Sequence, residues 1–354
     1  MDSTTFRILD IISAYLGESF SINRLTEKIK ETYGTAYYVN IYKRLHDLEK
    51  QEILNLNQLG KSSIIELNFR NYLLADFLTE MEIRKKIEFL KRKEDLQIFL
   101  AELEGYLNSL SSIKSVCSIK PEENLKLNRI ELLFLLRNSE EGMQVEDETT
   151  RIYAELQKLQ NKYNLRIDSL VLEQLDFFAL LRTDEINPLN EVLSKKIALF
   201  CPQAFWNEIK EIVEKGIKIR PGEMETKPAR INEIDLLYNL ARFGYREFGA
   251  RIEQGKKFCI EYIITALLLS GDARRIEATP IIIAKNDVKS NVMTFLAQKF
   301  GVSKRLLGLL RILQDIKCTK ETNRTIRLLE ALGVKETRAD ERSILDKMRL
   351  YDAV

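Results

Sequence analysis

The first 70 residues carry three apolar stripes of helical period, followed by two short runs that are typical of strands. The first stripe extends from Phe6 to Leu16, and Gly17 then ends it, as glycine commonly does at a helix C-terminus. A second helix is expected after Ser21, whose hydroxyl suits the N-cap position. Its inward-facing residues are expected to be Ile22, Leu25 and Ile29.

A third helix is expected over residues 37–51, and a two-stranded hairpin follows it. The buried stripe of this helix is expected to be Val39, Ile41, Leu45 and Leu48. The strand-like runs cover residues 53–57 and 63–69. The turn between them is not a phosphate-binding loop, because Asn55 stands where that motif requires a glycine five positions before Gly60.

Residues 71–110 connect this region to the next through one continuous helical pattern with dense mixed charge. Its apolar stripe consists of Leu74, Phe77, Leu78, Met81, Ile87, Leu90, Leu96, Phe99, Leu100, Leu103 and Leu107. Such a stripe packs against another helix, either in the same chain or in a second copy. Homodimerisation through residues 72–110 and packing within one chain both fit this pattern.

Between residues 111 and 215 the apolar period changes to that of strands and later returns to that of helices. The expected elements are strands over residues 113–118, 129–136 and 165–172, and a helix over residues 146–163. We therefore expect a small α/β domain with a mixed sheet. Residues 216–354 begin with a linker that contains proline and glycine and continue with helical patterns, which predict an all-α domain. The chain as a whole is expected to be α+β.

Charge differs between these regions although the whole chain carries a net charge of only +2. Residues 1–70 hold 9 basic and 9 acidic side chains, residues 71–214 hold 19 and 26, and residues 215–354 hold 27 and 18. The differences favour separate modules, although a solvated basic helix face also explains the positive C-terminal part. The near-neutral total excludes a global field that would attract nucleic acid or a membrane surface.

Composition excludes several other classes of function. A single histidine, His46, leaves few ways to build a histidine metal site or a catalytic triad. The four cysteines are Cys117, Cys201, Cys259 and Cys318. They form no CxxC pair, which disfavours a zinc knuckle and a disulfide scaffold. The chain has no basic secretory leader at its N-terminus and no apolar run long enough for a bilayer, so we expect a cytoplasmic protein without a membrane partner.

Three helices and a hairpin within residues 1–70 resemble a winged helix-turn-helix domain. In that family the third helix enters the major groove and the hairpin tip contacts the DNA backbone. The resemblance implies double-stranded DNA as a partner and the contact residues Tyr37, Tyr38, Asn40, Tyr42, Lys43, Arg44 and Lys61. Asn40 suits an adenine edge, whereas the three basic side chains suit phosphates. The zero net charge of this region leaves a protein-binding role open.

The order of elements in residues 111–215 resembles the minimal nucleotidyltransferase fold. That family places Gly-Ser at the end of one strand, Ser-Asp-x-Asp-Leu on the next strand and a third Asp on a later strand. Here Cys117-Ser118 stands at the first position and Asn128-Arg129-Ile130-Glu131-Leu132 at the second. The resemblance implies that Asp168 stands at the third.

These substitutions predict that the domain is catalytically inactive. In the family the carboxylates hold two magnesium ions against a nucleoside triphosphate. Arg129 places a cation at the first ligand position, Glu131 lengthens the second ligand, and Cys117 replaces the glycine that lets phosphates approach. We therefore expect the domain to hold no metal ion and no cofactor. We assign no catalytic residue among the degenerate positions Ser118, Arg129, Glu131 and Asp168. Mg²⁺ would be required only if the domain were active.

With its helical C-terminal part, nearly the whole chain resembles archaeal proteins that join a winged helix to a nucleotidyltransferase-like domain. Our hypothesis is a DNA-binding transcriptional regulator whose central pseudoenzyme domain serves as a sensor or scaffold. Two alternatives stay open: an active nucleotidyltransferase that modifies RNA or protein, and an interaction scaffold in a nucleic-acid-processing assembly.

Overall fold

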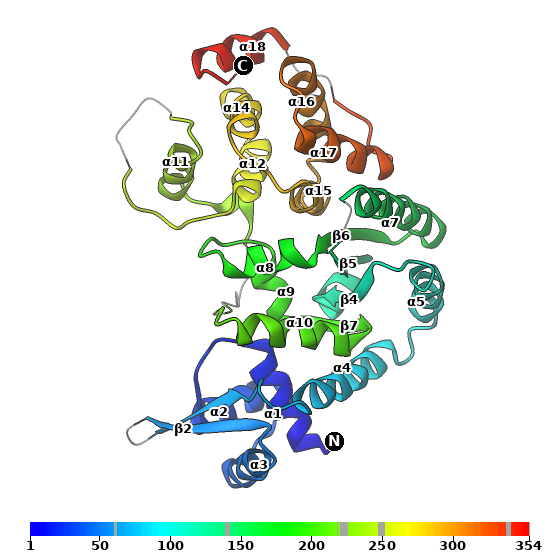
Figure 1. Ribbon diagram of the computed structural model, residues 1–354, viewed down its shortest axis with the longest axis vertical. Coiled ribbons are helices and arrows are strands. Elements are labelled where there is room, and N and C mark those ends of the chain that lie inside the picture. The colour runs from blue at the N-terminus through cyan, green and yellow to red at the C-terminus, as the bar shows by residue number, and fades with distance from the viewer. Residues whose placement is uncertain are drawn as a thin grey trace.

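Helices and two small sheets make the chain an α+β protein, as the sequence predicts at that level. A computed structural model describes residues 1–59, 62–138, 142–217, 219, 226–246, 252–337 and 341–353. Figure 1 shows the N-terminal region at one end, the central sheet in the middle and the C-terminal helices at the other end. Within the described ranges, no helix is long and apolar enough to cross a membrane.

The N-terminal region packs three helices against a three-stranded antiparallel sheet of order β1-β3-β2. Its elements are α1 (Ser3–Ala14), β1 (Phe20–Ser21), α2 (Ile22–Tyr33), α3 (Tyr38–Lys50), β2 (Leu54–Leu59) and β3 (Ser62–Leu67). The three helices and the hairpin agree with the sequence-based expectation. Strand β1, which pairs Phe20 with Ile65, was not predicted, because two residues are too few to show an alternating pattern.

Side-chain caps determine where these helices begin, and apolar faces determine which side of each helix is buried. The Ser21 hydroxyl accepts a hydrogen bond of 3.3 Å from the backbone N–H of Arg24, which confirms its predicted role as N-cap. The predicted inward face of α2 is buried. The prediction for Val39 was wrong, because this side chain is 74% exposed. A helix turns by about 100° per residue, so Val39 points away from the face that carries Ile41, Leu45 and Leu48.

Residues 71–110 form two helices rather than one: α4 (Leu74–Leu90) and α5 (Glu94–Leu107). The chain turns between them at Arg92, whose φ of 61° lies in the left-handed region. The apolar period continues across this turn, and neither glycine nor proline marks it, so the turn could not be predicted from the local pattern. Most of the apolar stripe is buried within the chain, whereas Ile87 is 62% exposed. Packing within one chain thus accounts for most of the apolar stripe without a second copy of the chain.

The central sheet has the order β6-β5-β4-β7 and is mixed, as expected. Its strands are β4 (Ile113–Ile119), β5 (Arg129–Leu136), β6 (Arg166–Glu173) and β7 (Lys196–Phe200). Strand β5 is parallel to β6, and β4 is antiparallel to both β5 and β7. The other elements of this region are α6 (Pro121–Leu125), α7 (Gly142–Tyr163), α8 (Gln174–Arg182), α9 (Leu189–Ser194) and α10 (Pro202–Glu214).

Helices cover both faces of this sheet. One face packs with α5 and α7 in a core of its own. The other face shares a larger core with α4, α10, the N-terminal region and the C-terminal helices. Side chains along each strand alternate between the two faces, so Glu131 and Leu133 of β5 lie on one face and Leu132 lies on the other.

The described residues from 226 onward contain helices, one isolated β-bridge and no strand. The helices are η1 (Pro228–Arg230), α11 (Glu233–Arg242), α12 (Ile260–Leu269), α13 (Ala273–Ile276), α14 (Ala278–Lys285), α15 (Ser290–Lys299), α16 (Ser303–Ile316), α17 (Lys320–Ala331) and α18 (Glu341–Leu350). Helix α15 packs along β6, and α17 packs against α7. The C-terminal helices therefore close over the sheet edge where β5 and β6 begin.

Candidate functional site

The N-cap residue and the first two turns of α3 present six side chains to solvent: Tyr37, Tyr38, Val39, Asn40, Tyr42 and Lys43. We call this set the α3 surface. Figure 1 places α3 at the end of the molecule, on the side away from the central sheet. Tyr37 is 71% exposed, so the surface begins with an aromatic side chain that lies outside the core. Five of the seven residues expected to contact DNA belong to this surface.

The aromatic rings of the α3 surface hold one another in place. Tyr38 and Tyr42, one helical turn apart, stack with their centroids 6.0 Å apart. Tyr42 in turn meets the imidazole of His46 edge-on at 4.5 Å. These contacts form a row of rings along one side of α3, and the phenol groups stay exposed.

Arg44 lies in different surroundings from those expected for a phosphate contact. Its guanidinium pairs with Asp2 at 2.6 Å and donates a hydrogen bond to the hydroxyl of Thr5. Burial opposes ionisation of Asp2, but hydrogen bonds from Thr5 and the charge of Arg44 lower the pKa of its carboxyl. Arg44 therefore holds α3 to the start of α1. Lys61, the seventh expected contact, lies outside the described residues.

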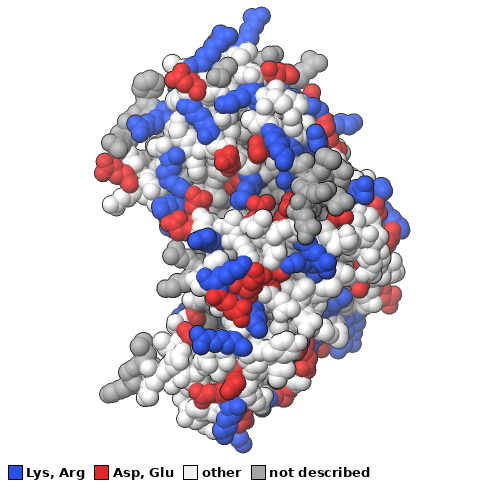
Figure 2. Space-filling model, in the orientation of Figure 1, with Lys and Arg blue, Asp and Glu red and all other residues white. Residues whose placement is uncertain are grey.

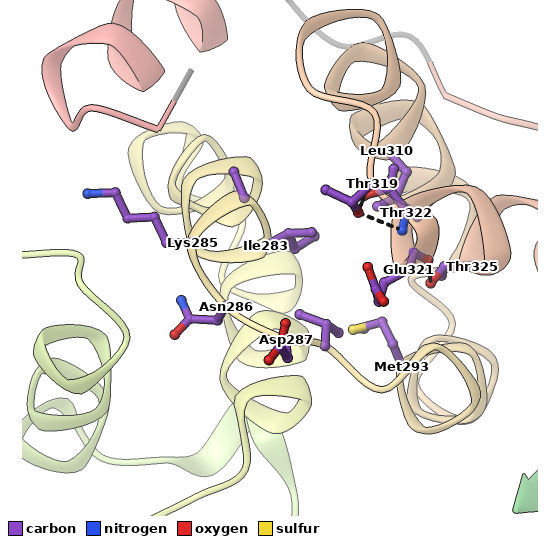
Figure 3. A pocket seen from close by; sticks show the side chains of 12 residues that line it. Ile283, Lys285, Asn286, Asp287, Met293, Leu310, Thr319, Glu321, Thr322 and Thr325 are labelled. Atoms are coloured by element: carbon purple, nitrogen blue, oxygen red, sulfur yellow. Dashed lines mark hydrogen bonds between the residues drawn. The ribbon is translucent and has the colours of Figure 1, made fainter.

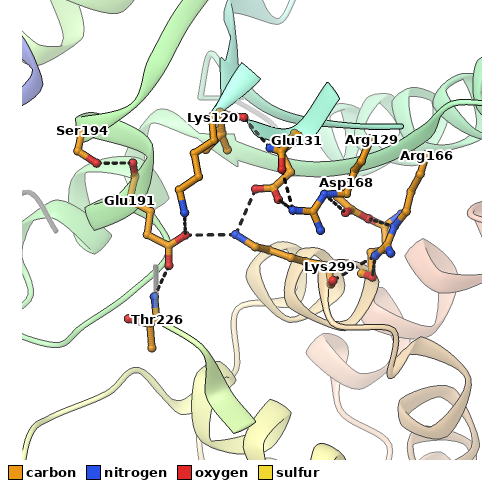
Figure 4. A network of polar contacts seen from close by, with 12 residues as sticks. Lys120, Arg129, Glu131, Arg166, Asp168, Glu191, Ser194, Thr226 and Lys299 are labelled. Atoms are coloured by element: carbon orange, nitrogen blue, oxygen red, sulfur yellow. Dashed lines mark hydrogen bonds and ion pairs between the residues drawn. The ribbon is translucent and has the colours of Figure 1, made fainter. Parts of the chain in front are cut away.

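The second candidate site is a group of charged side chains at the edge of the central sheet, shown in Figure 4. We call it the central charge cluster. Its members are Lys120, Arg129, Glu131, Arg166, Asp168, Glu191 and Lys299. Glu131 and Asp168 are register partners on the parallel strands β5 and β6. The structure thus brings together Arg129, Glu131 and Asp168, which stand at the second and third positions of the resemblance.

Arginines neutralise both strand carboxylates of the central charge cluster. Arg129 donates a hydrogen bond to Glu131, and its Nε lies 3.7 Å from a carboxylate oxygen of Asp168. Arg166 Nε lies 3.2 Å from the other oxygen of Asp168. Burial nevertheless dominates at Asp168 and raises the pKa of its carboxyl.

Two lysines complete the central charge cluster from outside the sheet. Lys299, at the end of α15, places its Nζ 3.1 Å from Glu131 Oε2 and 3.2 Å from Glu191 Oε2. Lys120 Nζ lies 3.5 Å from the same oxygen of Glu191. The other Glu191 oxygen accepts hydrogen bonds from the backbone N–H of Thr226 and from the hydroxyl of Tyr262. All three carboxylates of the cluster are therefore buried against cations or hydrogen-bond donors.

The sequence contains only a weak signal that Lys120, Glu191 and Lys299 belong to the central charge cluster. Lys299 follows Leu296 by three residues and thus falls on the buried side of its helix, where an unpaired lysine is rarely found. Nothing in the local pattern of Lys120 or Glu191 indicated a site. Their partners lie far away in the chain, and a local period carries no information about such pairs.

Two residues of the expected nucleotidyltransferase signature lie outside the central charge cluster. Ser118 pairs with Leu132 across β4 and β5, so its side chain lies on the sheet face opposite to Glu131. Its hydroxyl is buried and has no hydrogen-bond partner among the described residues. Cys117 is buried near Lys196 and Glu82, and this burial raises the pKa of its thiol to about 12.

The cluster offers cations rather than open ligand positions. Among the residues that the structure describes, no three or more His, Cys, Asp or Glu side chains form a group that could hold a metal ion. On the face of the molecule shown in Figure 2, basic and acidic side chains are interspersed. This face therefore carries no large patch of one charge sign.

A small pocket lies between α14, α15, α16 and α17, as Figure 3 shows. Its volume is about 150 Å³, and its walls combine Met293 and Leu310 with the exposed acids Asp287 and Glu321. The buried threonine hydroxyls that line it already have partners, since Thr319 donates to Thr322 and Thr325 donates to a backbone carbonyl. These hydroxyl groups therefore require no ligand.

Comparison with known proteins identifies no relative of this chain. No family model, no curated protein and no solved structure matches it. The α3 surface and the central charge cluster are therefore the features of this chain from which a function can be inferred.

Proposed function

We propose that this protein binds double-stranded DNA through the α3 surface and acts as a transcriptional regulator. On this proposal the N-terminal region is a winged helix-turn-helix domain, with α2 and α3 as the motif and the β2–β3 hairpin as the wing. The N-terminal residues of such a third helix contact base edges in the major groove. In this chain the same part of the third helix carries the α3 surface.

The observation that carries the proposal is the chemistry of the α3 surface. Asn40 supplies an amide of the kind that pairs with adenine, and Lys43 supplies an ammonium group suited to phosphate. Three exposed tyrosines supply hydroxyl groups that can donate to phosphate oxygens. No acidic residue occurs between positions 32 and 46, so this part of α3 contains nothing that repels a phosphate backbone.

For the central region we propose a nucleotidyltransferase-like domain that has lost catalysis and serves as a sensor or scaffold. The ion pairs of Arg129 and Lys299 support this part of the proposal. In-line nucleotide transfer requires carboxylates that hold two metal ions. In this chain the side chains of Arg129 and Lys299 form ion pairs with the carboxylates instead.

A binding assay with genomic DNA fragments tests the proposed function. The fragments include the DNA upstream of the gene for this protein, and retention is measured at two salt concentrations. Salt-dependent retention of particular fragments supports a sequence-specific regulator, because phosphate contacts release counterions. Equal, weak retention of every fragment, or no retention at all, contradicts it and favours a scaffold that binds protein through the α3 surface.

A further inference from the structure

We infer that the DNA site read by the α3 surface contains adjacent A·T pairs, and that Val39 contacts a thymine methyl group there. This inference rests on the proposed function and adds the base pairs that the protein prefers. The inference is based on the position of one apolar side chain, Val39, which lies outside the core.

Val39 is 74% exposed and lies in the first turn of α3. Its direction is fixed by the helix, because Ile41, Leu45 and Leu48 occupy the opposite side and anchor α3 in the core. Val39 therefore points outward from the part of α3 that would enter the groove. Among the bases, thymine alone presents a methyl group in the major groove, and an apolar side chain is its natural contact.

Asn40 adds a second preference for the same kind of base pair. Its backbone N–H bonds to the carbonyl of Tyr37, and its exposed side chain makes no hydrogen bond with a described residue. Its amide can therefore pair with N6 and N7 of adenine. Because adenine pairs with thymine, Val39 and Asn40 select the same kind of base pair at neighbouring steps.

The surroundings of Val39 favour DNA as the occupant of this surface. Lys43 lies one turn further along the same side of α3, where its ammonium group complements a phosphate. The nearest acids along α3 are engaged with cations or with His46, since Asp47 lies 3.9 Å from Arg44 and Glu49 lies 3.0 Å from His46. The stacked rings of Tyr38 and Tyr42 stiffen the neighbouring side of the helix.

The test begins with selection of bound sequences from a random duplex pool. Each thymine of the selected site is then replaced, one at a time, by deoxyuracil, which lacks only the methyl group. We expect enriched A·T steps and, at one position, an affinity about fourfold lower, the effect of roughly 0.8 kcal/mol for one buried methyl-sized group.

The variant Val39→Ser removes both methyl groups of the side chain and leaves a small hydroxyl-bearing residue, so no methyl group of residue 39 can contact thymine. We expect this variant to bind the thymine and the deoxyuracil site equally. The matched control is Ile87→Ser, which changes another exposed β-branched residue, on α4, and should keep the full fourfold effect. Thermal unfolding of Val39→Ser should equal that of the unaltered protein, because the side chain is outside the core.

The possible outcomes separate this inference from the proposed function. If no sequence is enriched, DNA binding itself is wrong. Enriched sites without A·T steps, or sites on which deoxyuracil has no effect, overturn the inference and leave DNA binding intact. A deoxyuracil effect that persists in Val39→Ser overturns the role of Val39.

Discussion

Lys43 and Arg44 are neighbours on α3, but their side chains have different surroundings. Lys43 is exposed, whereas Arg44 is paired with Asp2. We predict that Lys43→Ala weakens binding to every DNA sequence and makes the salt dependence shallower by about one counterion. The matched control is Lys50→Ala, because Lys50 is exposed at the other end of α3. Equal effects of the two variants in a titration at several salt concentrations would contradict the assignment of Lys43.

For Arg44→Ala we predict an effect on folding rather than a specific effect on DNA binding. The variant loses a partly exposed ion pair, which is worth about 0.2–1 kcal/mol, together with the hydrogen bond to Thr5. Urea unfolding should therefore detect a small loss of stability. A large change in the salt dependence of DNA binding with unchanged stability would show that Arg44 contacts phosphate after all.

At the residue scale, the sequence predicts which side chains are buried only where the helical period determines the side of the helix to which each one points. Ile41, Leu45 and Leu48 were predicted correctly because they share one side of α3. Val39 was placed with them although it lies about 200° from Ile41 at 100° per residue. The role of Arg44 could not be foreseen, because its partner comes from the start of the chain and not from α3.

At the scale of secondary structure, α15 brings a lysine to the buried end of β5. We predict that Lys299→Met lowers the free energy of unfolding by about 3–5 kcal/mol, since it leaves buried carboxylates without a cation. The double variant Lys299→Met, Glu131→Gln should lose less than the sum of the two single variants, because the charges are removed together. Urea unfolding of the three variants measures this coupling.

The control for this cycle is Lys158→Met on α7, whose lysine is 74% exposed and pairs with Glu155 on the surface. The free energy of unfolding of this variant should differ from that of the unaltered protein by less than about 1 kcal/mol. Additive losses for Lys299 and Glu131 would mean that their proximity contributes nothing to folding.

The strands themselves were predictable, whereas the group of charges that they carry was only partly so. Strand β5 has the predicted bounds because its apolar run is flanked by polar residues. The register that places Glu131 beside Asp168 agrees with the order of elements expected from the sequence. The closure of this edge by Lys299 could not be predicted, because it depends on how α15 packs along β6.

At the scale of the whole molecule, a second set of buried charges joins the N-terminal region to the central sheet. Lys85 of α4 lies 2.9 Å from Asp10 of α1, and Glu82 of α4 accepts a hydrogen bond of 3.0 Å from the backbone of Ala198 in β7. Lys196 lies 4.4 Å from the ring centroid of Trp206. These contacts fix how α1 sits against the sheet.

We predict that Asp10 makes stability depend on acidic pH. Burial opposes its ionisation, but Lys85 and a hydrogen bond from Tyr33 lower the pKa of the carboxyl below its ordinary value of 3.8. The stabilisation is therefore present above that value and is lost as the pH falls through the lower pKa of the folded state. Urea unfolding of Asp10→Asn should show lower stability at neutral pH and a smaller loss on acidification.

The control for Asp10 is Asp315→Asn, which changes an exposed aspartate on α16. It should leave the acid dependence of stability unchanged. If Asp10→Asn shows the same acid dependence as the unaltered protein, the ion pair with Lys85 does not stabilise the joint between the two regions.

The central charge cluster also determines whether the molecule can catalyse nucleotide transfer, since that reaction requires carboxylates that hold metal ions. We predict no transfer of labelled nucleotide from any of the four ribonucleoside triphosphates to RNA, to protein or to the chain itself, with Mg²⁺ or Mn²⁺. Arg129 and Lys299 carry positive charges within about 4 Å of the carboxylates that metal ions would need. The informative variant combines Arg129→Asp with Lys299→Met, which removes both cations and adds a carboxylate. Transfer that appears only in this variant would indicate a lost active site, whereas transfer by the unaltered protein that Asp168→Ala abolishes would make it an active nucleotidyltransferase.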